Sequence, residues 1–299
     1  LLEPKRLSNV RDGRLGFWVL ERETTMPGAS VGKLVRRYDV FIAIALFVGA
    51  IAAERAEVFS LLEEQTLSVR QNFRWIYGDK EQLKFSDQVF MVNTDEDFFQ
   101  EYGGFPFKRS DIGKLVKNLK ALGAKVIALD VLMDFPSSYG DDGPLAKELA
   151  AAGNTLLVSQ AQIEDGKFIR LNYPTATLDS VSSSAYTNIS SSSSIVTSLS
   201  RLKVYPEVAK ERNGWPYAVM AVAMYLGVEP VLEGNILKIG DNIAVPLDDF
   251  QTFYIDFPEM IASARFLSDF KGMSALEIQH LDIEDEDEMV RVRQTRLAY

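Results

Sequence analysis

The chain has 299 residues, of which 47% are hydrophobic, so it can enclose a sizeable core in one large domain, with or without appendages. The absence of cysteine excludes disulfides and thiolate metal sites. The formal net charge of -10 argues against general nucleic-acid binding, because contacts with phosphates need a basic face.

The N-terminal part differs in composition from the rest. Residues 1–37 are basic and interrupted by Gly and Pro, and an uncharged apolar run follows from Val40 to Ala53. A spanning helix needs about 20 mostly apolar residues, so this run is short unless its flanks lengthen it. The basic residues directly before it match a cytoplasmic flank. We predict a cytoplasmic segment over 1–37, a single membrane-anchor helix over 38–57 and a periplasmic, extracytoplasmic domain over 58–299; a buried soluble helix is the alternative.

Two short apolar runs rich in strand-forming residues each end at an acid. The first covers 89–94 and stops at Asp95 and Glu96; the second covers 124–129 and stops at Asp130. Between them, apolar residues recur at helical spacing over 112–122. This pattern predicts a βαβ unit whose neighbouring parallel strands bring their acids to one edge of the sheet. Open α/β sheets bind their ligands at that edge.

The remaining sequence predicts further elements in chain order. They are a helix over 145–152, a strand over 155–160, a hairpin partner over 167–171, a serine-rich loop over 180–200, a helix over 217–226, strands over 237–239, 243–245 and 252–257, and a solvated helix after the acidic run 282–288. The predicted fold class is therefore α/β, with α+β features in the second half. It has a parallel-containing central sheet with flanking helices, preceded by the membrane-anchor helix.

Clustered carboxylates are the main candidates for chemistry. The acids expected near the sheet edge are Asp95, Glu96, Asp130, Asp134, Asp141 and Asp142. Such groups can bind hard cations or act as acid and base. The chain has no glycine-rich phosphate loop, no cysteine nucleophile and a single histidine far along the sequence, so we predict no catalytic residue, metal or cofactor. A metal-dependent hydrolase that uses Asp95, Asp130 and Asp141 is the enzyme alternative.

Three other side chains each have two interpretations. Arg109 either pairs internally with Asp95 or Asp130, which would fix its loop against the sheet, or binds a ligand. Phe105 either forms an apolar lid over the acids or anchors its loop to the core. Trp215 either lines a pocket or fills the core.

The succession of motifs resembles the second CHASE type of bacterial sensory domain. The motifs are a strand followed by Asp95-Glu96, the loop Gly103 to Arg109, an amphipathic helix, Gly123 to Asp130, Asp141 to Leu145, Ala185 to Ile189, Gly214 to Tyr217, Leu237 to Gly240, Ile243 to Asp248 and Tyr254 to Phe257. The resemblance implies an extracytoplasmic input module, tethered by membrane helices to a histidine kinase, nucleotide cyclase or similar effector. The chain ends before the further strand and membrane helices usual in that family, so we expect a C-terminally incomplete domain.

These observations predict a membrane-anchored, extracytoplasmic sensory domain of a bacterial signal-transduction protein, without a catalytic effector in this chain. We expect a protein partner or a homo-oligomer, allow an unknown small ligand and expect no nucleic acid. The alternative is a non-catalytic accessory or scaffold subunit of a membrane or cell-surface assembly.

Overall fold

The structure is a computed structural model that describes residues 31–55, 88–164, 167–188, 201–249, 251–255 and 272–296, with a few positions between 66 and 86. It consists of two units, residues 1–58 and residues 59–299, and each is treated separately. The predictions for residues 1–30, 56–57 and 189–200, and for the end of the strand predicted over 252–257, lie outside the described residues.

The first unit contains one long helix, α1 (Val31–Arg55). The predicted anchor overlaps it at residues 38–55. Its large apolar side chains from Val40 to Ile51 are exposed within the unit. Among the helices that the structure describes, none is both long enough and apolar enough to cross a membrane.

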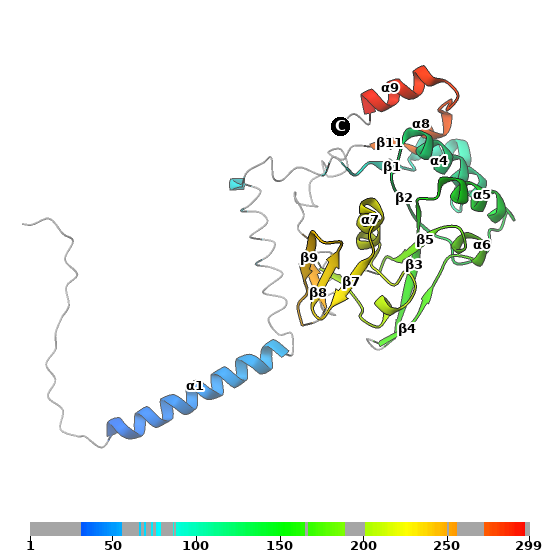
Figure 1. The fold of residues 1–299 in the computed structure, drawn as a ribbon. Helices are drawn as coiled ribbons and strands as arrows, with labels where there is room; N and C mark the ends of the chain where they lie inside the picture. Colours follow the sequence, from blue (N-terminus) through cyan, green and yellow to red (C-terminus); the bar gives the residue numbers. More distant parts are fainter. Residues whose placement is uncertain are drawn as a thin grey trace, which may run out of the picture. The chain divides into compact units, whose positions relative to one another are not determined.

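The second unit is a mixed α/β domain built around strand β3 (Thr155–Glu164) (Figure 1). The first half of β3 pairs in parallel with β2 (Ile127–Leu132) and with β5 (Ser183–Tyr186). Its second half pairs with β4 (Lys167–Asn172) in an antiparallel hairpin. The helix α5 (Asp142–Ala152) connects β2 to β3, so β2, α5 and β3 form a βαβ unit.

The predicted pairing of the two acid-ended strands is wrong. Strand β1 (Met91–Asn93) does not join β2 in a sheet; it pairs in parallel with β11 (Gly272–Ser274). Two helices lie between β1 and β2, because Asp95 begins a short helix, α3 (Glu96–Tyr102), before α4 (Arg109–Leu122). The parallel crossover expected after β1 therefore occurs one strand later, between β2 and β3.

The β1–β11 pair packs closely. A Cβ atom added to Gly272 would lie 2.6 Å from the carbonyl oxygen of Met91, which no real Cβ tolerates. Glycine therefore allows the two strands to approach each other.

The second half of the domain contains smaller antiparallel sheets, consistent with the predicted α+β features. Strands β7 (Pro230–Glu233), β8 (Ile236–Ile239) and β9 (Ile243–Pro246) form one sheet. A second pair joins β6 (Arg201–Lys203) and β10 (Thr252–Tyr254). Helix α7 (Tyr217–Leu226) lies beside β7 and β8 (Figure 1) and covers a core that includes Leu237 and Ile239.

Most of the remaining elements agree with the sequence pattern, and two differ. The predicted serine-rich loop contains β5, which pairs with β3. The strand forms there because the side chains of Ser184, Ala185 and Tyr186 are buried in the domain. The predicted solvated helix is α9 (Glu286–Arg296), and it buries Met289 and Val292 in the main core.

The main core lies between α4, α5, α8 (Ala275–His280) and α9. Apolar residues on one face of α4 supply it, as their spacing predicts, and Gly123 ends the helix in a left-handed conformation with φ of 97°. Arg109 begins this helix, so the packing of α4 fixes the position of that side chain.

Candidate ligand-binding groove

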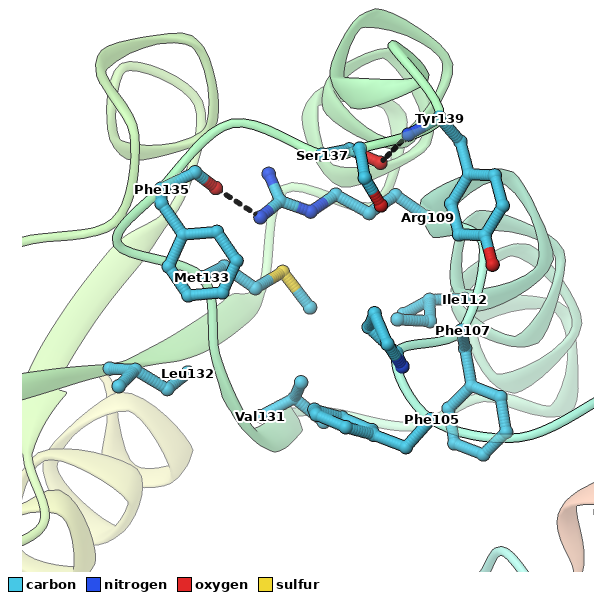
Figure 2. Close-up of a pocket in the computed structure, with 12 residues that line it drawn as sticks. Phe105, Phe107, Arg109, Ile112, Val131, Leu132, Met133, Phe135, Ser137 and Tyr139 are labelled. Carbon is cyan, nitrogen blue, oxygen red and sulfur yellow. Dashed lines mark hydrogen bonds between the residues drawn. The ribbon is translucent and has the colours of Figure 1, made fainter.

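A groove opens between the loop that precedes α4 and the segment that connects β2 to α5. About 430 Å³ of space lies within it, and this volume includes open solvent at its mouth. Figure 2 shows aromatic side chains from both segments around it, with the side chain of Arg109 along one border. Its lining consists of Phe105, Pro106, Phe107, Arg109, Ile112, Val131, Leu132, Met133, Phe135, Ser137, Ser138 and Tyr139.

Arg109 joins the two sides of the groove. Its guanidinium is buried; Nη1 donates to the Asp142 carboxylate and Nη2 donates to the Phe135 carbonyl (Figure 2 draws the second bond). The prediction that Arg109 pairs with Asp95 or Asp130 is therefore wrong, because the start of α5 lies closer to it than either strand end. The pairing does fix the segment between β2 and α5 over the start of α4.

Asp141 and Asp142 hold the same segment from its other end. Asp142 accepts from the Ser137 backbone N–H at 3.2 Å, and Asp141 accepts from the Ser110 backbone N–H at 2.9 Å and from the Ser137 hydroxyl. Burial alone would raise the pKa of Asp141, but these hydrogen bonds together lower it below the ordinary value. The carboxylate is thus held in its charged form.

Asp95 and Glu96 lie away from the groove lining, at the start of α3. The Asp95 carboxylate caps α3 by accepting from the Phe98 N–H at 3.1 Å. The hydrogen bond from the Ser274 hydroxyl lowers the pKa of Asp95 most, and the Phe98 N–H lowers it further. Glu96 is exposed in the first turn of α3.

Asp130 and Asp134 are both exposed, on β2 and just after it. The structure does not unite the predicted acids: Asp142 pairs with Arg109 and Asp141 bonds Ser110 and Ser137, whereas Asp95 caps α3. Within the described residues, no three His, Asp or Glu side chains are arranged to hold a metal ion. The three acids of the hydrolase alternative therefore do not form one site.

Comparison with known families matches residues 41–297 to the CHASE2 domain. The chain belongs to the CHASE2 domain family. CHASE2 domains are extracytoplasmic sensory domains, typically of signalling proteins, and no catalytic domain is found in this chain. No curated protein and no solved structure matches the chain.

In this CHASE2 domain the aromatic candidates have different environments. Phe105 lines the groove with 67% of its surface exposed, and its ring centroid lies 6.0 Å from that of Phe107. Trp215 is buried in the second core among residues of α7 and β8, and it is absent from the lining of the groove.

Several groove residues of the CHASE2 domain were not predicted from the sequence. Ser137 links the two acids to the loop, and Met133, Phe135 and Tyr139 form much of the apolar border. Their signal was the continuation of the apolar pattern past Asp130, through Val131 and Met133, into a turn. For Asp95 the overlooked signal was the pair of acids that follows it, which is typical of a helix N-terminus.

Proposed function

We propose that this chain is the sensory, ligand-binding domain of a bacterial signal-transduction protein and that it binds its ligand in the groove beside Arg109. The groove supports this proposal because exposed aromatic side chains and a few polar groups converge on a concave surface. The hydrogen bonds of Arg109, Asp141 and Asp142 hold both of its sides.

The location of the domain can be tested by fusing reporters to the C-terminus of the full chain. Alkaline phosphatase needs disulfides and is active only outside the cytoplasm, whereas a fluorescent protein of the GFP type folds inside. We expect active phosphatase and no fluorescence. Fluorescence with inactive phosphatase, at equal expression by immunoblot, would contradict an extracytoplasmic sensory role.

A second reporter position tests whether both ends of the domain lie on the same side of the membrane. The same pair of reporters fused after Gly78, ahead of strand β1, should give the same result as the C-terminal fusions. Opposite results at the two positions would contradict the placement of the whole domain on one side of the membrane.

A further inference from the structure

We infer that the groove accepts an uncharged, ring-bearing apolar ligand and that Arg109 positions the groove without recognising an anion. This inference rests on the proposed function and specifies the ligand class of the same site. A buried arginine at the border of a pocket would ordinarily indicate an anionic ligand. The partners and the burial of this arginine argue against that interpretation.

The guanidinium of Arg109 has protein acceptors at both terminal nitrogens. Only 5% of the residue is exposed, and the acceptors are the Asp142 carboxylate and the Phe135 carbonyl. An anionic ligand would have to enter this buried position and compete with the Asp142 carboxylate, which would lose its cation if the pair opened. Breaking a buried pair in this way is strongly unfavourable.

The neighbouring charged groups are also occupied. Asp141 accepts from Ser110 and from the Ser137 hydroxyl, and the Ser137 hydroxyl accepts from the Tyr139 backbone N–H at 3.2 Å. Arg109 and Asp142 compensate each other's charge, and the Asp141 carboxylate, which has two neutral donors, is not part of the groove lining. A ligand with a net charge gains no ionic partner here and loses its own hydration.

Apolar surface is what the groove offers to a ligand. Phe105, Phe135 and Tyr139 are 67%, 58% and 54% exposed, although each lines the groove. Figure 2 shows these rings around the open space, with Val131 and Met133 also at its border. A planar ring can bury several of these surfaces at once, and aromatic pairs favour such contacts beyond the buried area. The Tyr139 and Ser138 hydroxyls can serve one polar group of the ligand.

Three probes that share one ring system test this ligand class: indole is neutral, indoleacetate is an anion and tryptamine is a cation. Ligand-observed NMR titrations of the full chain should give a Kd for indole roughly ten-fold lower than for either charged probe. Phe105→Ala and Phe135→Ala should each weaken indole binding about five-fold. The Phe135 carbonyl remains in its variant, so its bond to Arg109 is retained.

Val231→Ala removes an exposed apolar side chain from β7, outside the groove lining, and should leave indole binding unchanged. Tighter binding of indoleacetate or tryptamine than of indole overturns the ligand class. If the charged probe then loses its binding in the Phe105 and Phe135 variants, the groove is still the place where it binds. If no probe binds, or if binding ignores both groove variants, the inference fails. The reporter fusions test the sensory role by a separate readout, so the two failures are distinguishable.

Discussion

Arg109 is held by two acceptors from the segment between β2 and α5: the Asp142 carboxylate and the Phe135 carbonyl. The arginine side chain is 6% exposed and that of Asp142 is 19% exposed, so water screens the pair only weakly. Removal of one partner leaves the other uncompensated, which is costly in a buried position.

We expect Arg109→Met and Asp142→Asn each to lower the free energy of unfolding by about 3 kcal/mol. The double variant should lose much less than the sum of the two, because the second change removes the stranded partner. Urea denaturation measures all three. Lys238→Met breaks the exposed pair with Glu233 and should cost about 1 kcal/mol or less, which makes it the matched control. Additive losses would contradict a direct Arg109–Asp142 interaction.

Asp111 gives a prediction for the pH dependence of stability. Burial is the main cause that raises its pKa above the ordinary value of 3.8, and the neighbouring Asp141 contributes in the same direction. A carboxyl whose pKa is raised on folding favours the folded state while it is protonated. This contribution to the free energy of unfolding is lost as the pH rises through the folded pKa. Asp111→Asn should therefore be more stable than the wild type at pH 7 and equally stable well below pH 3.8.

Urea denaturation at several pH values measures this difference. The bond from Gln279 reaches the backbone carbonyl of Asp111, so the substitution leaves it in place. A constant difference between the two proteins at every pH would contradict the pKa direction.

The sequence predicted structural features correctly where they depend on residues close together in the chain. The apolar spacing over 112–122 predicted the helix α4, and Gly123 ends it directly after that run as its left-handed C-cap. The partner of Arg109 could not be predicted, because Asp95, Asp130, Asp141 and Asp142 are chemically equivalent in the sequence. Which of them reaches Arg109 depends on how α4 packs against α5.

Helix α8 is attached to α4 by two buried side-chain amides. Asn118 donates to the Ile278 carbonyl at 2.7 Å, and Gln279 donates to the Asp111 carbonyl at 2.7 Å. Gln279 is fully buried, and its side-chain oxygen has no hydrogen-bond partner among the residues that the structure describes. These bonds fix the segment that follows β11 onto the helix that begins at the groove.

We expect Gln279→Glu to lower the free energy of unfolding by about 3 to 5 kcal/mol at pH 7, because a buried carboxylate cannot donate to the Asp111 carbonyl. Burial raises the pKa of such a carboxyl, so the loss should shrink as the pH falls and the protonated acid donates again. Urea denaturation at pH 7 and pH 4 measures both values.

Gln294→Glu changes the same side chain at an exposed position of α9 and should have little effect. A small or pH-independent loss for Gln279→Glu would contradict its role as the buried attachment of α8.

Element prediction succeeded where apolar spacing carried the information, as for α4 and β3. It failed for β1, because its partner β11 is a three-residue strand far along the chain and the pairing depends on the close approach at Gly272. When a short strand lacks a clear alternation of apolar and polar residues, its sequence does not indicate its partner or its register.

The domain as a whole belongs to the CHASE2 family, and its resemblance was visible in the order of motifs. The motifs included two segments that meet beside the groove, the loop ending at Arg109 and the acids at the start of α5. They did not indicate that Arg109 and Asp142 compensate each other, and this pairing is what leads us to infer an uncharged ligand.

A crystal structure of the full chain soaked with indole tests this account most directly. We expect the ring in the groove between Phe105 and Phe135, with the bond from Arg109 to Asp142 intact. Indole bound elsewhere on the domain, or Arg109 turned away from Asp142 toward the bound molecule, would contradict it.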